Sequence, residues 1–442
     1  MKHTKTLIDT DYFGTESIGR ILLNIAPPVM LAQLIQALYN IVDSFFVGRY
    51  SVDALTALSV IYPLQLILIA LAVGTGVGVN TYMAKKYAQN RPDAADKAAG
   101  TGMVLELMTW AVIAVTSLLI MRPYVLLSAK SDAAVSDAIC YGNIVSVGSI
   151  GLFLEGNWTK VHQARGNMRL PMIAQIIGAI INIVFDPLLI FGMDIFPGLG
   201  VAGAAYATVL GQIAAAVITA FGGIRRPPAF RELKHYIGRI YYYGYSSIVM
   251  QSLYTVYILG LNIILAGFSD AAVTVLGLYY KLQSFFFIPL FGLQVCIVPV
   301  LSFNYTRRDY KRCREIMRDS LMVSAGFMIA GIIAFVLFPD RLTALFSDNA
   351  AVAEVGCTAF PIIGSSFIPA AVTLMMPVFF QAIGKGITSM MLSIIRQLFC
   401  LVPIFKLFSL LGLNYAWFSF PVSEIISGTV CVIMYIREIR KW

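Results

Sequence analysis

Residues 163–177, QARGNMRLPMIAQII, are matched 218 positions later by residues 381–395, QAIGKGITSMMLSII. Identical residues in the two stretches include glutamine, glycine and methionine: Gln163 and Gln381, Gly166 and Gly384, Met172 and Met390. Chance matches between apolar helices are common, but matches of Gln and Gly at one constant offset are much rarer. The pattern therefore indicates a chain built from two related halves.

Further matches lie at the same offset on both sides of this stretch. They pair Gln33 with Gln251, Tyr39 with Tyr257, Gly74 with Gly292, and Tyr87 with Tyr305. An even number of membrane helices in each half makes both halves enter the membrane in the same sense. A pseudo-two-fold axis along the membrane normal then relates them, and many transporters bind substrate between such halves. A duplicated scaffold without transport is the alternative.

The composition is that of a polytopic membrane protein. Of 442 residues, 59% are hydrophobic and only 12% are charged, about half the usual charged share of a soluble protein. The mean hydropathy is +0.80. The apolar stretches are long enough to span a bilayer as helices, which excludes a β-barrel with its roughly ten-residue alternating segments. Twelve predicted helices cover 18–47, 56–84, 98–121, 134–162, 170–193, 199–222, 238–266, 272–302, 315–338, 351–380, 386–408 and 413–436.

The basic residues predict the topology of this all-α protein. Of the 32 Lys and Arg residues, 25 lie on the side of the N-terminus and only 5 on the other side. The positive-inside rule then places both termini in the cytoplasm and the protein, as a multi-pass protein, in the inner (plasma) membrane. The net charge of +9 is explained by these loops and does not indicate nucleic acid. The expected organisation is a tail (1–17), a six-helix lobe (18–222), a cytoplasmic linker (223–237), a second six-helix lobe (238–436) and a tail (437–442).

Two predicted helices of the first half carry acids inside the membrane. Asp43 lies near the outer end of helix 18–47, and Asp186 lies at a similar depth on helix 170–193, one turn from Asn182. Charged groups in the hydrocarbon region are costly and usually functional. We expect these residues to form an H⁺ or Na⁺ site, although each acid alone could be structural. The polar face of helix 18–47 that leads to Asp43 contains Gln33, Gln36 and Asn40, with Tyr39 on a neighbouring edge.

The second half does not repeat this acidic site. At the offset of 218, Asp43 becomes Leu261, Asn182 becomes Cys400 and Asp186 becomes Ile404. Instead, the second half has an aromatic and amide-rich wall, which includes Gln251, Tyr254, Tyr257 and Gln283. Such a wall can hold bulky organic cations through π contacts, or it can be ordinary packing with inter-helix hydrogen bonds.

Five other charges lie within or near the predicted helices, and their roles stay open: Glu106, Glu155, Lys281, Arg396 and Glu424. Glu424 is expected to neutralise either Lys281 or Arg396, whereas Glu155 is expected to face water near a helix end. Pro361, Pro369 and Pro377 are expected to let helix 351–380 bend, because each leaves backbone carbonyls unpaired.

Motifs for metal or enzyme chemistry are missing from the sequence. The six cysteines are scattered without a CxxC pair, and there are only three histidines and no HExxH motif. We therefore expect no enzyme activity, no cofactor and no metal other than a Na⁺ at Asp43, Asn182 and Asp186.

Several of these stretches resemble the multidrug and toxic compound extrusion (MATE) family, most of all its bacterial branch with an acidic first lobe. They are residues 39–48 (YNIVDSFFVG), 166–172 (GNMRLPM), 182–192 (NIVFDPLLIFG), 200–208 (GVAGAAYAT) and 381–384 (QAIG). The resemblance implies cation-coupled efflux by rocking of two lobes. It implies ion-coupling roles for Asp43, Asn182, Asp186, Tyr39 and Thr208. Some members have acids on the seventh and tenth helices, where this chain has Gln251 and only Glu354, at the outer end of the tenth.

The predicted function is thus export of organic cations or drugs from the cytoplasm in exchange for H⁺ or Na⁺, by alternating access. The predicted partners are the lipid bilayer and these small molecules, with no obligate protein partner. A lipid-linked saccharide flippase of the same general fold is an alternative, although its pyrophosphate ligand calls for a cationic cavity. An intramembrane enzyme is the remaining alternative.

Overall fold

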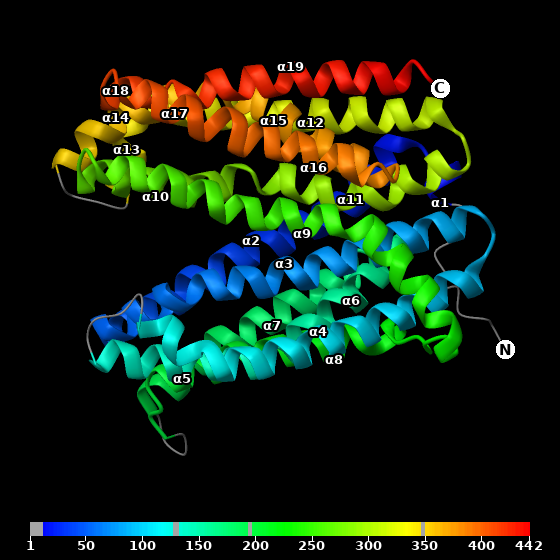
Figure 1. Cartoon of the computed structure of the whole chain (residues 1–442), viewed down its shortest axis with the longest axis horizontal. Coiled ribbons are helices and arrows are strands. Elements are labelled where there is room, and N and C mark those ends of the chain that lie inside the picture. The colour runs from blue at the N-terminus through cyan, green and yellow to red at the C-terminus, as the bar shows by residue number, and fades with distance from the viewer. Residues whose placement is uncertain (1–11, 127–131, 193–196, 346–349) are drawn as a thin grey trace. The chain divides into compact units, whose positions relative to one another are not determined.

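A computed structural model describes residues 12–126, 132–192, 197–345 and 350–442, and all regular structure in these ranges is helical (Figure 1). The first half contains α1 (Tyr12–Thr15), α2 (Ile18–Tyr50), α3 (Val52–Ala88), α4 (Pro92–Leu126), α5 (Asp132–Gly148), α6 (Ile150–Ala164), α7 (Arg169–Pro187), the π-helical turn η1 (Leu188–Gly192) and α8 (Val201–Gly223).

The second half contains a matching series of helices. They are α9 (Phe230–Ala266), α10 (Asp270–Phe286), α11 (Ile288–Thr306), α12 (Tyr310–Leu337), α13 (Pro339–Ala344), α14 (Ala350–Gly364), α15 (Phe367–Ala382), α16 (Gly386–Ile394), the π-helical η2 (Ile395–Leu401), α17 (Val402–Ser409), α18 (Leu413–Ala416) and α19 (Ser419–Ile439).

Length and apolar composition qualify these helices as membrane spans. Within the described residues, ten helices meet both conditions, and the number rises to twelve when two bent pairs, α5 with α6 and α14 with α15, each count as one span. The prediction of twelve membrane helices in two six-helix lobes is confirmed. Helices dominate because only they satisfy their own backbone hydrogen bonds within one segment in lipid.

Four predicted helices are interrupted, and one of them, helix 413–436, is broken at Trp417 and Phe418, between α18 and α19. Helix 134–162 bends by 40° at Ser149, and helix 351–380 bends by 56° between α14 and α15. Helix 272–302 is broken at Phe287, between α10 and α11. The second bend lies between Pro361 and Pro369, as the proline spacing predicted. The part of segment 223–237 that lies between α8 and α9 is short, because α9 already begins at Phe230.

The described chain forms two compact units. The first contains residues 27–248 together with the described residues before Glu16, and the second contains residues 16–26 and 249–442. Helix α2 therefore changes unit at Pro27, and α9 changes unit after Ile248. Both changes occur inside continuous helices rather than in loops.

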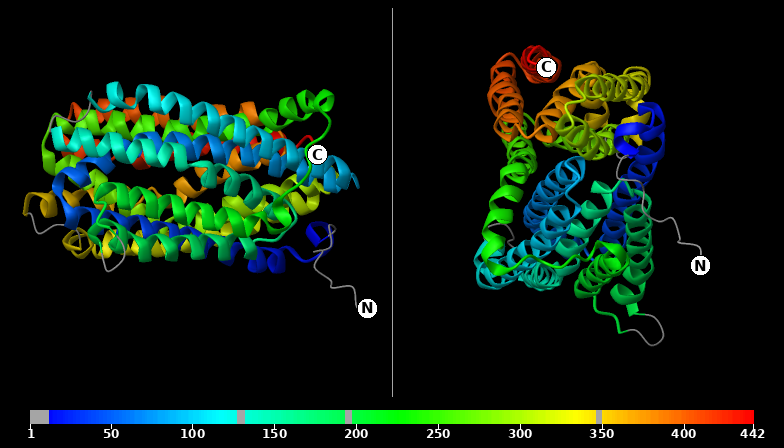
Figure 2. Two further views of the ribbon diagram at one scale, coloured as in Figure 1. Left: turned by 90° about the horizontal axis from the view of Figure 1, so that it is seen from below. Right: turned by 90° about the vertical axis from the view of Figure 1, so that its right-hand side faces the viewer.

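In the first unit, α3 packs against α4, α5 and α6, and α8 packs against α5, α6 and α7. The right-hand view of Figure 2 looks along these helices, so they are seen end-on. Small residues line the contacts, with Ala54, Ala57, Ala138 and Ala204 all fully buried. Small side chains let membrane helices approach closely, which favours van der Waals packing. In the second unit, α15 has the corresponding central place and packs against α11, α12, α16 and α19.

Helix ends repeat at the same offset as the sequence. Ser51 caps α3 by accepting a hydrogen bond from the N–H of Ala54, and Ser269, 218 residues later, caps α10 through the N–H of Ala272. Gly166 and Gly384 follow α6 and α15 with φ of 79° and 85°, a left-handed conformation that glycine adopts without steric cost. The two halves thus share their helix boundaries as well as their residues.

Candidate functional site

A close approach of α7 and α8 brings the predicted ion-coupling residues of these helices together. Gly178 on α7 faces Gly211 on α8 so closely that a Cβ at Gly178 would lie 2.7 Å from the carbonyl oxygen of Gly211. Asn182 lies one turn beyond Gly178, and Thr208 lies one turn before Gly211. The glycine pair therefore sets the distance between these two polar side chains.

Asn182 connects the predicted site across the two helices. Its Nδ2 donates to Oδ1 of Asp186 at 3.3 Å and contacts Oγ1 of Thr208 at 3.4 Å. All three residues are buried. Asp186 lies directly before Pro187 and the π-helical η1, a kind of turn that is rare and often found at functional sites. The structure thus brings together three residues that the sequence placed on two helices.

Asp43 on α2 completes the cluster. It is buried, and its carboxyl group lies beside that of Asp186. Among the described residues, Oδ1 of Asp43 and Oδ2 of Asp186 have no hydrogen-bond partner. Two carboxyl groups make such a contact when they share a proton or when a cation lies between them, because two bare carboxylates repel each other. The pair therefore has the chemistry of an H⁺ or Na⁺ site.

A cavity of about 90 Å³ opens beside this cluster, between α2, α6, α7 and α8. Its polar lining comes from four helices and includes Gln36, Tyr39, Glu155, Gln175, Asn182, Thr208 and Gln212. Drug-sized ligands usually occupy about 300 to 1,000 Å³. In this conformation the cavity is the size of a few water molecules or a small hydrated cation.

Glu155 is the one acid among the described residues that line this cavity. It accepts a hydrogen bond of 2.6 Å from Thr159, and Gln175 on α7 lines the same cavity. Glu155 is half-buried and faces this water-sized cavity, two turns or more before the end of α6. The packing of α6 against α7 and α8 turns it toward the cavity.

Sequence reasoning missed Tyr141 on α5. Tyr141 is 2% exposed, and its hydroxyl accepts a hydrogen bond of 3.3 Å from Gln65. The hydroxyl group of Tyr141 also lies near that of Thr208, so Tyr141 borders the candidate site. A lone tyrosine between Ala138 and Gly142 was a usable signal, because a buried tyrosine hydroxyl needs a partner.

Only some of the other predicted cavity residues on α2 line the cavity. Gln36 and Tyr39 line the cavity, Gln33 does not, and the side chain of Asn40 lies outside the described part of the structure.

In the second unit, Gln251 is exposed, whereas Tyr257 and Gln283 are buried. The rings of Tyr254, Tyr257 and Tyr280 lie edge to face, with centroids 5.5 to 6.2 Å apart. The predicted tyrosine wall is thus a packed aromatic cluster.

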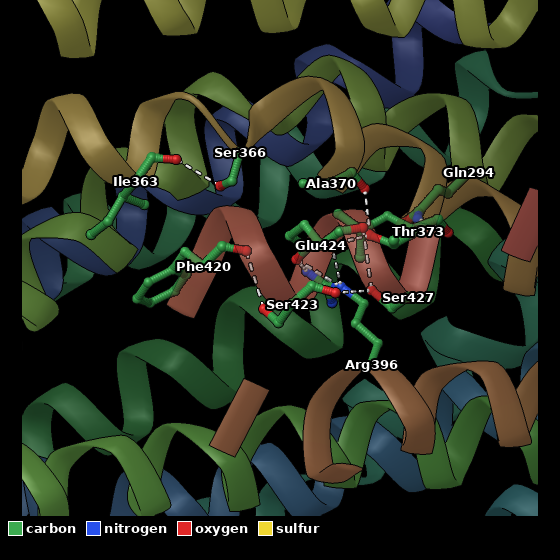
Figure 3. Close-up of polar contacts among 11 residues, drawn as sticks. Gln294, Ile363, Ser366, Ala370, Thr373, Arg396, Phe420, Ser423, Glu424 and Ser427 are labelled. Carbon is green, nitrogen blue, oxygen red and sulfur yellow. Dashed lines mark hydrogen bonds and ion pairs between the residues drawn. The ribbon is translucent and has the colours of Figure 1, made fainter. Parts of the chain in front are cut away.

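Glu424 pairs with Arg396 and not with Lys281, which is exposed. The guanidinium donates to Oε1 of Glu424 from Nη2 at 2.6 Å and from Nε at 2.9 Å (Figure 3). Thr373 on α15 donates its hydroxyl to the same carboxylate. The ion pair joins η2, α15 and α19 inside the second unit.

Glu106 on α4 is fully buried, and neither of its carboxyl oxygens has a hydrogen-bond partner among the described residues. The described part of the chain holds no group of three or more His, Cys, Asp or Glu residues that could bind a metal ion.

Comparisons with known proteins find relatives that match most of this chain. The model of the family described as MatE matches residues 28–188 and 246–405. The chain is 23% identical to an "FAD transporter" of Shewanella oneidensis over 425 residues, which covers 94% of this chain and 93% of that protein. It is also 23% identical to the "Multidrug export protein MepA" of Staphylococcus saprophyticus over 436 residues, covering 96% and 93%.

Solved structures show the same fold. One is the outward-facing conformation of a multidrug resistance MATE family transporter, with a TM-score of 0.91, 21% identity, and coverage of 100% of this chain and 99% of that one. Another is a MOP superfamily transporter from Pyrococcus furiosus, with a TM-score of 0.90, 21% identity, and coverage of 99% of each chain.

Proposed function

Because the chain belongs to the MatE family of membrane transporters, we propose that it exports small organic cations from the cytoplasm in exchange for H⁺ or Na⁺. The contact between the carboxyl groups of Asp43 and Asp186, beside a polar cavity, carries this proposal. The similarity to multidrug export proteins supports the class of substrate.

The proposed coupling uses the two states of the carboxyl pair. With a proton or Na⁺ bound, Asp43 and Asp186 stay together and the cluster with Asn182 and Thr208 is closed. When the ion leaves, the two charges repel each other and attract a cationic substrate. Alternating access then requires that ion and substrate each stabilise a different state of the transporter.

The proposed setting is the inner (plasma) membrane, with both termini in the cytoplasm. The bias of basic residues supports this orientation. No obligate protein partner is part of the proposal.

The similarity to an "FAD transporter" favours a second candidate, the export of a flavin nucleotide. The aromatic rings of Tyr254, Tyr257 and Tyr280 suit a flat ring system, whereas the acids of the first unit suit a cation. The two candidates differ in the sign of the substrate charge.

Purified protein in liposomes tests both candidates. An imposed H⁺ or Na⁺ gradient should drive an organic cation such as ethidium against its own gradient, and dissipation of that ion gradient should stop it. Flavin nucleotide uptake without cation transport would replace the first candidate by the second. Movement of neither substrate under any gradient would contradict both.

A further inference from the structure

A second cavity, of about 460 Å³, lies between α6 and α8 in the first unit. Its walls are apolar and include Leu154 and Trp158 on α6, Val217 and Ala220 on α8, and Ile224 just after α8. It shares no lining residue with the cavity beside Asn182. We call it the α6–α8 crevice.

The crevice is open to the surroundings of the unit. Val217 is 53% exposed and Ile224 is 52% exposed, and both lie at its edge. Helix α8 is apolar and long enough to span a membrane. The molecules that meet such a surface in a bilayer are lipid acyl chains.

The wall of the crevice contains one tryptophan, Trp158 on α6. The indole Nε1 of Trp158 is buried in the wall and has no hydrogen-bond partner among the described residues. Buried tryptophan N–H groups usually have an acceptor. Nε1 is covered by protein and Trp158 is only 7% exposed, so Trp158 contributes an apolar wall to the crevice and reports on its occupancy by fluorescence.

The end of the crevice at Ile224 is basic. Arg225 follows directly, but its charge is engaged by Asp96 at 3.1 Å. The side chain of Arg226 is exposed, and the described residues offer it no ion pair or hydrogen bond. One uncompensated cationic group therefore lies two residues beyond the apolar wall, and no acid lines the crevice.

We propose that the α6–α8 crevice binds an anionic phospholipid, with an acyl chain along the apolar wall and the phosphate group near Arg226. The charge distribution selects this occupant, because Arg226 attracts an anionic headgroup and repels a cationic drug. Basic groups at the end of an apolar pocket between membrane helices are a known arrangement for anionic lipids.

The site has a structural consequence for the transporter. Helix α6 carries Glu155 and α8 carries Thr208, so both helices that form the crevice also line the cavity of the candidate coupling site. A bound lipid would hold these two helices at a fixed separation.

Fluorescence quenching by brominated lipids tests the proposal. The Trp158 signal is the difference between the parent protein and Trp158→Phe, both reconstituted in nanodiscs. We expect phosphatidylglycerol with a brominated acyl chain to quench this signal at least twofold more than brominated phosphatidylcholine. Ala220→Phe, or Val217→Phe at the more open edge, should fill the crevice and remove the quenching, whereas Leu210→Phe, an exposed α8 residue outside the crevice, should leave it unchanged.

Native mass spectrometry gives a second readout that does not depend on Trp158. The parent and the control Arg231→Gln should retain phosphatidylglycerol in preference to phosphatidylcholine, and Arg226→Gln should lose that preference. Equal binding of both lipids by the parent, or retention of phosphatidylglycerol by both crevice-filling variants, would overturn the proposal. Failure of drug transport alone would leave these outcomes unaffected, because neither readout measures transport.

Discussion

Nη2 of Arg396 lies 2.6 Å from Oε1 of Glu424, and both residues are buried inside the second unit. Each charge is costly to bury alone, so the two stabilise the fold only as a pair. Since the pair joins η2 to α19, its loss should affect the packing of the second unit rather than the chemistry of the first.

The first prediction concerns this ion pair. Arg396→Met should lower the free energy of unfolding by about 3–5 kcal/mol, because it leaves Glu424 buried without a partner. The double variant Arg396→Met/Glu424→Leu should regain most of this loss. Thermal unfolding in detergent measures the effect, with Lys281→Met as an exposed control. An equal loss in the single and double variants would show that the charges do not act as a pair.

The second prediction concerns coupling. Asp43→Asn or Asp186→Asn should abolish ion-driven efflux while the protein remains folded, because an amide keeps the size of the carboxyl group but neither releases a proton nor neutralises Na⁺. Proteoliposome transport measures this, and Asp93→Asn, at an exposed acid of the same unit, is the control. Normal gradient-driven transport by either variant would remove that aspartate from the site.

The third prediction concerns Thr208. Thr208→Val removes the hydroxyl group that accepts a hydrogen bond from Asn182, and a net hydrogen bond contributes about 0.5–1.5 kcal/mol. The affinity for the coupling ion should therefore fall by about twofold to tenfold, whereas Thr208→Ser should stay near the parent. Transport rate against ion concentration measures the affinity. Identical curves for the Val and Ser variants would show that the hydroxyl has no part in ion binding.

The fourth prediction concerns the difference between the two halves. Conservative changes at Gln251, Tyr254 or Tyr257 should change the preference among drugs while ion dependence persists. Changes at Asp43 or Asp186 should alter ion dependence for every drug. Transport of several cations against pH and Na⁺ in both sets of variants measures this. Loss of ion dependence only in the second-half variants would show that the ion-coupling residues lie in the second half and not in the first.

The fifth prediction concerns topology. Cysteines introduced in place of Phe230 and Arg440 should resist an impermeant thiol reagent in intact cells and react after permeabilisation, because the basic bias places both positions in the cytoplasm. Ready labelling of either position in intact cells would contradict the proposed orientation.

Helix number and helix ends could be predicted from the sequence, because apolar run length and the 218-residue repeat are local properties. The bend near Ser365 could also be predicted from the sequence, since Pro361 and Pro369 flank it. The interruptions at Ser149 and Phe287 also have local signals, since Gly148 and Gly151 flank Ser149 and Pro289 follows Phe287. These signals alone do not predict a break, because membrane helices tolerate both residue types and the break depends on how several helices pack together.

The contacts of the candidate site fall into the same two groups: those that follow from one helix and those that depend on packing between helices. Asn182 and Asp186 are one turn apart on one helix, so their contact follows from helix geometry. The direction of Glu155 and the contact between Tyr141 and Thr208 depend on how α5, α6 and α8 pack, which no local pattern contains. The choice of Arg396 over Lys281 as the partner of Glu424 likewise required the positions of η2 and α19.

The shared helix ends have a consequence for the surrounding bilayer. Helix α3 has 37 residues, and its counterpart in the second half, α10 and α11 with Phe287 between them, runs from Asp270 to Thr306 over the same length. A straight helix of that size is about 55 Å long, against a hydrocarbon layer of about 30 Å. Because these lengths are equal, a thicker or thinner membrane imposes the same hydrophobic mismatch on this span in both halves. Lipid chain length should therefore shift the stability of the two halves together, without favouring one over the other.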